Sequence, residues 1–290
     1  MSAFAAVRVA PAPVRRHVCS SPRANVRRVA ASAASVPASG AELLSRMDIE
    51  SPGWSGGYGT GGKIWSSSRV LCDFLVDVAT GLEDCGGFEL CGARVVELGS
   101  GTGVVGIACA ALGAGQVVLT DGGSKSLLKL AEENAARNVR AKTIDPDTTT
   151  MRVCGYKWGS RLPEKLTKNA PFDLIIGSDC TYAVGGHGGL CDAILDLAKC
   201  AGDADTNEKR EPTVILAHQH RTLAAALASR GSSGWGRDPN LEMFIETANK
   251  RGLRVEEIRL VKLAWHGLRN VSVLRVARRA TETISWERPG

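Results

Sequence analysis

Short apolar runs alternate with segments of helical periodicity along most of the chain. Val70, Leu71, Phe74 and Leu75 recur at the spacing of one helical face and predict a helix over 66–79. The same pattern predicts further helices over 104–112, 124–140, 190–200 and 241–251. Apolar runs with the length of buried strands lie at 94–98, 116–120, 151–155, 172–178, 213–218, 253–264 and 270–277.

The order of these elements predicts an α/β fold. Strands that alternate with helices form right-handed crossovers, so a doubly wound, mostly parallel sheet of seven strands is expected. A tight connection through residues 265–268 joins the last two apolar runs and is too short for a helical crossover, so these runs predict an antiparallel hairpin at one edge. No internal repeat or second domain is visible, and residues 42–290 are interpreted as one domain.

The first 41 residues differ in composition from the rest of the chain. They contain six arginines, no lysine and no acidic residue, and they are rich in alanine, serine, valine and proline. This composition is typical of an organelle transit peptide. The uncharged start and the serine and proline content favour the chloroplast, with the mitochondrion as the alternative. A basic, disordered arm that stays attached would have a similar composition.

The remainder of the chain carries no net charge. Without the six arginines the 36 basic residues fall to 30, which equals the number of acidic residues. The basic surface expected of a nucleic-acid-binding protein is therefore missing. No apolar run reaches the roughly 18 residues that a membrane span needs. Neither nucleic acid nor a membrane is expected as a partner; the sequence does not determine the oligomeric state, and a monomer is favoured.

A glycine-rich turn joins the first predicted strand to the next helix. Gly99 and Gly101 allow a sharp turn and close approach to a ligand. Asp121 ends the following strand, where a carboxylate can accept both hydroxyls of a ribose. Val104 stands where the dinucleotide fingerprint has its third glycine, and Glu97 suits a cationic ligand better than a pyrophosphate, although it could also bind amides of the loop itself. These features favour S-adenosylmethionine over NAD.

The segments VVELGSGTGVVGIACAALGA at 95–114 and VVLTD at 117–121 resemble the first two motifs of the seven-strand methyltransferases. Further segments are similar to one branch, methyltransferase family 16, which contains many protein-lysine methyltransferases. These are GGKIW at 61–65, KWG at 157–159, DCTY at 179–182 and the arginine of His220-Arg221. The resemblance spans roughly residues 58–277.

This resemblance implies a Rossmann-like methyltransferase fold with S-adenosylmethionine as cofactor. It places seven residues around the cofactor, namely Trp65, Gly99, Ser100, Gly101, Asp121, Trp158 and Ser178. Glu97 joins them through its place beside the glycine-rich turn. For the two tryptophans, packing in the core is the alternative interpretation.

The resemblance also implies that Asp179 and Tyr182 are catalytic. Asp179 is expected to hold and orient an acceptor amine, and Tyr182 to supply a wall and a hydroxyl group. Methylation of a planar amide or adenine nitrogen is typical of an Asp/Asn-Pro-Pro-Tyr motif. Segment 179–182 contains no proline, which favours a more basic nitrogen. Alternatively, Asp179 could cap its loop by accepting backbone amides.

The resulting hypothesis is an S-adenosylmethionine-dependent methyltransferase that acts on a lysine side chain of a protein. A small-molecule acceptor and a non-catalytic scaffold with the same fold stay open as alternatives. His218 and His220 lie at the end of a predicted strand, but no third ligand is near them in the sequence, so no metal site is expected. Segment 57–63 nearly spells a phosphate loop, yet Ile64 follows where Ser or Thr would be needed.

Overall fold

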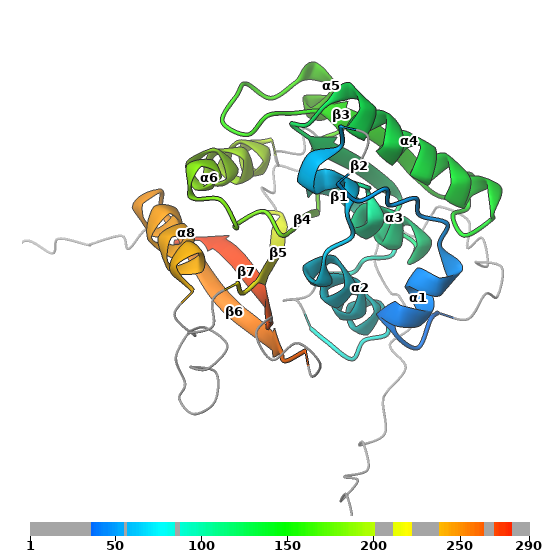
Figure 1. Ribbon diagram of the computed structural model, residues 1–290, viewed down its shortest axis with the longest axis horizontal. Coiled ribbons are helices and arrows are strands. Elements are labelled where there is room, and N and C mark those ends of the chain that lie inside the picture. Colours follow the sequence, from blue (N-terminus) through cyan, green and yellow to red (C-terminus); the bar gives the residue numbers. More distant parts are fainter. Residues whose placement is uncertain are drawn as a thin grey trace, which may run out of the picture. The chain divides into compact units, whose positions relative to one another are not determined.

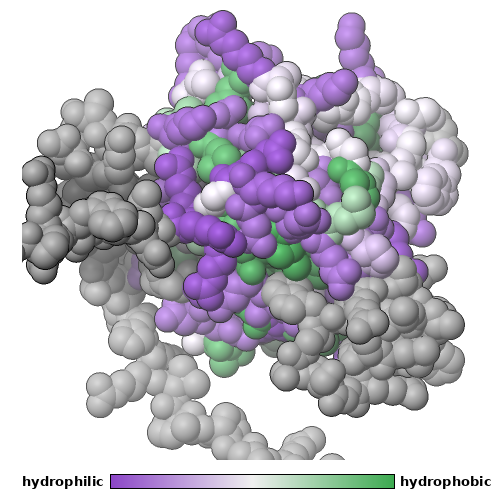
Figure 2. Space-filling model, turned by 90° about the vertical axis from the view of Figure 1, so that its left-hand side faces the viewer, coloured by the Kyte–Doolittle hydropathy of each residue, from purple (hydrophilic) through white to green (hydrophobic). Residues whose placement is uncertain are grey.

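The computed structural model describes residues 36–54, 57–84, 88–200, 211–221, 238–263 and 270–279. Most of the predicted transit peptide and the connection at 265–268 lie outside these residues. Among the helices described, none is both long and apolar enough to cross a membrane. The face drawn in Figure 2, on the side of α6 and α8 in Figure 1, is largely hydrophilic, with apolar residues in small groups.

Seven strands form one sheet in the order β3-β2-β1-β4-β5-β7-β6 (Figure 1). The strands are β1 (Arg94–Leu98), β2 (Gln116–Asp121), β3 (Thr150–Gly155), β4 (Leu174–Ser178), β5 (Thr213–Gln219), β6 (Leu253–Val261) and β7 (Val271–Arg278). β1 to β5 are parallel, whereas β7 is antiparallel to both β5 and β6. The structure confirms the predicted mostly parallel sheet and its antiparallel C-terminal hairpin.

Helices cover both faces of this sheet (Figure 1). They are α1 (Gly40–Arg46), η1 (Gly59–Gly62), α2 (Ser66–Ala79), α3 (Val104–Ala111), α4 (Lys125–Arg140), α5 (Glu164–Thr167), α6 (Val184–Lys199) and α8 (Pro239–Lys250). Successive residues of a strand point to opposite faces, so Val95 joins the core beneath α2 and α3, and Val96 joins the core beneath α6 and α8. Burial on both faces explains why the strands are continuous apolar runs.

The largest difference from the sequence prediction is the start of α6. This helix begins at Val184, six residues before the predicted start at 190. Four glycines in its first turns disfavour a helix by intrinsic propensity. Tertiary packing outweighs this preference. The helix packs so closely against Trp158 that a Cβ atom at Gly189 would lie only 2.9 Å from the main-chain oxygen of Trp158, so glycine is needed at this position. The short elements α1, η1 and α5 were not predicted either.

Two buried asparagines of α4 hold the segment that precedes the cavity described below. The main-chain N–H of Asp48 donates to Asn138 Oδ1 (3.0 Å), and that of Glu50 donates to Asn134 Oδ1 (2.9 Å). The Asn134 Nδ2 atom donates in turn to the carbonyl oxygens of Glu50 (3.1 Å) and Thr102 (2.9 Å). Asn134 therefore joins α4, the N-terminal segment and the turn before α3.

Glu97 is a buried carboxyl group at the base of the turn between β1 and α3. Its side chain is 1% exposed, and Oε2 accepts the main-chain N–H of Gly106 at 2.8 Å. Burial raises the pKa of Glu97 to about 8, because the charged form loses its hydration. The amide that Glu97 binds belongs to the first turn of α3 and not to the glycine-rich loop, where the alternative had placed it.

We predict that Asn134→Ala lowers the free energy of unfolding by about 2 kcal/mol or more. The substitution leaves buried main-chain groups without partners, each at a cost of about 1–3 kcal/mol. Urea unfolding of the purified protein measures this change. Glu132→Ala, at an exposed position of the same helix, is the matched control and should have little effect. Equal effects of the two substitutions would contradict the role assigned to Asn134.

A second prediction concerns the pH dependence of stability. The folded protein retains the Glu97 proton up to about pH 8, whereas the unfolded chain releases it near the ordinary value of 4.5. The folded state therefore binds more protons between these values, and Glu97 makes the free energy of unfolding fall as the pH rises through this range. Glu97→Gln should remove this part of the fall. Parallel pH profiles for the wild type and the variant would show that Glu97 is ionised in the folded protein.

Candidate active site

A cavity of about 710 Å³ opens at the carboxyl ends of β1, β2 and β4. This is the edge of an open α/β sheet at which ligands bind, and the volume is in the range of small-molecule sites. All ten residues that the sequence assigned to the site line this one cavity: Trp65, Glu97, Gly99, Ser100, Gly101, Asp121, Trp158, Ser178, Asp179 and Tyr182.

The glycine-rich turn brings the main chain close to its neighbours. Gly99 and Gly101 have φ angles of 68° and 52°, in the left-handed region that favours glycine. A Cβ atom at Gly99 would lie 2.9 Å from the ring of Trp158, and one at Gly101 would lie 2.7 Å from the carbonyl oxygen of Gly61. Any side chain at either position would therefore push apart the walls of the cavity.

Asp121 projects from the end of β2 beside this turn. Its Oδ2 accepts the N–H of Gly101 at 2.9 Å, and its Oδ1 accepts the N–H of Gly123 at 2.7 Å. These two bonds fix the orientation of the carboxylate. Each carboxylate oxygen has a further lone pair, so Asp121 can still accept two hydroxyl groups from a ligand such as a ribose.

Several polar atoms at the cavity are buried and have no hydrogen-bond partner among the described residues. Among them are the Ser100 hydroxyl, the Trp158 indole nitrogen and Asp179 Oδ1. Buried polar groups normally have partners, and leaving one unpaired costs free energy. A ligand that carries several polar groups would satisfy these atoms, and the nucleoside and amino-acid parts of S-adenosylmethionine meet this requirement.

Ser178 and Trp65 connect the cavity to the start of α2. The Ser178 hydroxyl lies 2.7 Å from that of Ser68 and 3.3 Å from that of Ser67. Trp65 precedes α2, donates from Nε1 to the carbonyl oxygen of Thr60 at 3.1 Å, and packs edge-on against Trp54 at 5.8 Å between ring centroids. Trp65 thus lies in the wall of the cavity and not in the hydrophobic core.

The segment that resembled a phosphate loop forms part of the same wall. Residues 59–62 make the single turn η1, and Gly61 faces the glycine-rich turn through its carbonyl oxygen. The Lys63 Nζ atom lies 4.7 Å from the centroid of the Trp65 ring. A phosphate loop would present its amides at the start of a helix after a strand. This segment follows no strand, and it contributes to the wall instead.

Asp179 directly follows β4 and is 6% exposed. Its φ angle of 57° is unusual for a residue other than glycine. Its Oδ2 pairs with the guanidinium of Arg221, while its Oδ1 has no hydrogen-bond partner in the ranges that the structure describes. Within the described part of the chain the Asp179 side chain accepts no main-chain N–H, so the arrangement does not match the alternative of a loop cap.

Arg221 stands among the family-like segments of the sequence, but the sequence predicted no role for it in the site. It follows β5, and its guanidinium carbon lies 5.3 Å from the ring centroid of Tyr182 and 5.7 Å from that of Trp65. Tyr182 itself is 42% exposed at the rim. Asp179 therefore lies in a pocket whose far side is formed by one cation and two aromatic rings. The position of Arg221 at the end of a strand next to β4 was the available sequence signal.

A family model described as lysine methyltransferase matches residues 48–225. The chain is 29% identical over 151 residues to the protein N-terminal and lysine N-methyltransferase efm7 of Emericella nidulans, covering 50% of this chain and 55% of that protein. It is 35% identical over 124 residues to the protein N-lysine methyltransferase METTL21A of Danio rerio, covering 43% and 49%. The chain thus spans about half the length of these relatives.

Among solved structures, a putative RNA methyltransferase from Pyrococcus horikoshii matches with a TM-score of 0.46 and 14% identity, covering 84% of this chain and 98% of that one. Magnesium protoporphyrin IX methyltransferase from Synechocystis matches with a TM-score of 0.44 and 16% identity, covering 74% and 86%. The family assignment does not depend on these two solved structures. Because the family model matches 178 of the 290 residues, from 48 to 225, this protein belongs to the lysine methyltransferase family.

Proposed function

We propose that this protein transfers the methyl group of S-adenosylmethionine to the side-chain amine of a lysine in another protein. The observation that carries the proposal is Asp179 Oδ1, a buried acceptor without a partner in the same cavity as the glycine-rich turn and Asp121. The names of the relatives support a protein as acceptor.

The residues of the cavity fit the two ends of the methyl donor. Asp121 and the turn at Gly99 and Gly101 would hold the nucleoside, with Trp158 beside it. Trp65 would cover the part of the ligand that faces α2. When bound, S-adenosylmethionine supplies an electrophilic methyl group on a sulfonium, for in-line displacement by a nucleophile held about 3 Å away.

Asp179 would hold the acceptor amine. A lysine must release one proton to water before its amine attacks the methyl carbon and S-adenosylhomocysteine leaves. This release costs about 4–5 kcal/mol at pH 7 from a reference pKa near 10.4. An isolated carboxylate would oppose this loss by stabilising the ammonium form. The guanidinium of Arg221 reduces the effect, because it balances the charge of Asp179 and leaves Oδ1 as a hydrogen-bond acceptor. Tyr182 and Trp65 would exclude water from the lysine methylene chain.

The proposed reaction is tested with the purified full chain, radiolabelled methyl donor and a protein extract. Methyl-lysine in the acid hydrolysate of a labelled protein band is the expected result. Label confined to small molecules would contradict the protein acceptor. Calorimetry with S-adenosylhomocysteine is the accompanying binding measurement, and an absence of binding would contradict any methyltransferase activity.

We also propose that residues 1–41 direct the protein to the chloroplast. The support is their composition, with six arginines and no acidic residue. Fusion of these residues to a fluorescent protein in plant cells is the test, with plastid fluorescence as the expected result. Mitochondrial fluorescence would favour the alternative compartment, and diffuse fluorescence would contradict targeting.

The neutral charge of the remaining chain supports a protein acceptor over nucleic acid. We also propose that the enzyme acts as a monomer.

For the catalytic step we predict that Asp179→Asn lowers the rate of methyl transfer by about 100-fold or more. Asparagine keeps the size of the side chain but removes the charge that pairs with Arg221 and orients the acceptor. The affinity for S-adenosylhomocysteine should change only a few-fold. Asp147→Asn, on an exposed loop, is the control and should retain activity. If Asp179→Asn lost cofactor affinity together with activity, Asp179 would have a structural role.

A further inference from the structure

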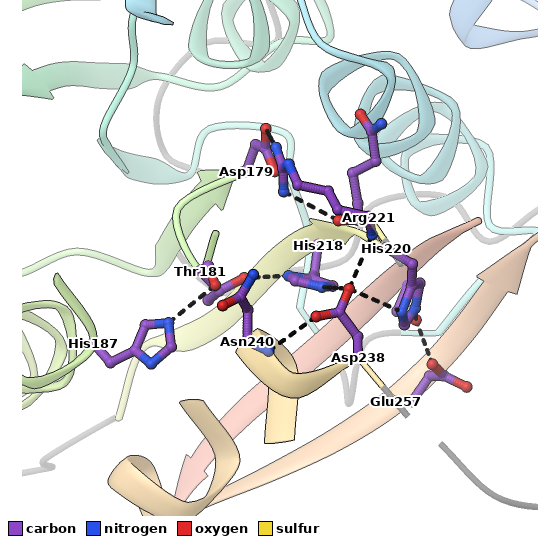
Figure 3. Close-up of polar contacts among 11 residues, drawn as sticks. Asp179, Thr181, His187, His218, His220, Arg221, Asp238, Asn240 and Glu257 are labelled. Carbon is purple, nitrogen blue, oxygen red and sulfur yellow. Dashed lines mark hydrogen bonds and ion pairs between the residues drawn. The ribbon is translucent and has the colours of Figure 1, made fainter. Parts of the chain in front are cut away.

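A second cluster of polar side chains lies behind Asp179 (Figure 3). His218 belongs to β5, His220 directly follows this strand, and Asp238 precedes α8. One ligand atom from each residue can be chosen so that all three lie within 4.8 Å of one another. His218 Nε2 and His220 Nδ1 both face Asp238 Oδ2. The three residues are 0%, 4% and 0% exposed. None of the three lines the active-site cavity.

The hydrogen bonds around His220 determine which of its nitrogens carries the proton. Ser272 donates its single hydroxyl proton to Glu257. The Ser272 oxygen lies 2.7 Å from His220 Nε2, so it must accept the Nε2 proton of the imidazole. The neutral ring then has a lone pair on Nδ1. This atom faces Asp238 Oδ2 at 3.8 Å and forms no hydrogen bond with any residue that the structure describes.

His218 presents a second buried nitrogen to the same carboxylate. Its Nδ1 lies 2.6 Å from the hydroxyl of Thr181, and its Nε2 lies 3.3 Å from Asp238 Oδ2 without meeting the geometry of a hydrogen bond. The two imidazole rings pack edge to face at 5.1 Å between centroids. Within the described part of the chain neither nitrogen has a partner that meets hydrogen-bond geometry, and both face the same buried carboxylate oxygen.

Asp238 is itself fixed by main-chain donors. Its Oδ2 accepts the N–H of Arg221 and its Oδ1 accepts the N–H of Asn240, both at 3.0 Å. Neutral His218 could direct an Nε2 proton at Asp238 if the Thr181 hydroxyl donated to Nδ1, but the lone pair of His220 Nδ1 would still face the carboxylate without a donor. A metal ion would satisfy all three donors at once.

We infer that His218 Nε2, His220 Nδ1 and Asp238 Oδ2 form a binding site for one divalent transition-metal ion, with zinc as the best match. Imidazole and carboxylate are ordinary zinc ligands, and three side-chain ligands are the number found in zinc sites that keep an open position. Ligand atoms around tetrahedral zinc lie about 3.3 Å apart, since the bonds are about 2.0 Å long. The separations from Asp238 Oδ2 are 3.3 and 3.8 Å, and all three ligand atoms lie within 4.8 Å of one another, so a small shift of one imidazole would complete the tetrahedral arrangement.

The residues around the three ligands are those expected of a metal site. A metal-bound histidine generally gives its other N–H to a carboxylate, a backbone carbonyl or water, which sets the tautomer. Side-chain hydroxyls take this place here. Thr181 can accept the Nδ1 proton of His218, and Ser272 with Glu257 accepts that of His220. An ion here would also bear on the active site, because Asp238 binds the main chain of Arg221, whose guanidinium pairs with Asp179.

The test is cobalt and zinc binding by the full chain after removal of metal with a chelator. We expect about one ion per chain, a visible cobalt spectrum typical of nitrogen and oxygen ligands, and a higher melting temperature with zinc. His220→Ala should weaken binding by more than the roughly 10- to 100-fold that loss of an outer partner costs. Asp238→Asn is the second variant: it keeps a side chain able to cap α8 but removes the charged ligand.

His187→Asn is the matched control, because His187 is a buried histidine that contacts the carbonyl oxygen of Thr181 and lies outside the three ligands. It should bind cobalt as the wild type does. Absence of stoichiometric binding, unchanged binding in both ligand variants, or a strong thiolate-to-cobalt band from cysteine ligands would each overturn the inference. The measurement needs no methyl donor, so its outcome is separate from that of the proposed function.

Discussion

The ion pair between Asp179 and Arg221 joins the ends of β4 and β5, and the arrangement of the active site depends on it. Asp179 has a left-handed backbone conformation, which costs on the order of 1–3 kcal/mol and persists only where neighbouring groups hold it. Arg221 holds the carboxylate from one side, and its main-chain N–H is bound by Asp238. One oxygen of Asp179 remains free as a result, and this is the atom to which we assign the acceptor amine.

Three carboxyl groups at the same edge of the sheet have three different environments, and their proposed roles follow from this. Glu97 is fully buried with one amide partner, and burial raises its pKa to about 8. Asp121 is held by two amides and keeps lone pairs for the hydroxyls of a ligand. Asp179 has a cationic partner on one oxygen and none on the other. All three residues carry a carboxyl group, and their surroundings determine whether that group is buried and protonated, binds hydroxyls or holds an amine.

The sequence predicted those features that arise from local periodicity or from a local motif. The strand at 94–98 was predicted at the bounds observed, and the residues of the glycine-rich turn and of segment 179–182 line one cavity. Features that depend on distant partners were missed. The bonds of Asn134 to Glu50 connect positions 84 residues apart, and Asp238 reaches His218 from another element. The first turns of α6 were not predicted, because their glycines disfavour a helix and the close packing against Trp158 that stabilises it cannot be read from the sequence.

The central claim is that one cavity holds the methyl donor and places the reacting methyl group at Asp179. A crystal structure with sinefungin, an analogue with an amine at the position of the methyl group, tests it most directly. The account predicts that the ribose hydroxyls bind Asp121 and that the amine lies within hydrogen-bond distance of Asp179 Oδ1. A nucleoside bound outside this cavity, or an amine directed away from Asp179, would contradict the account.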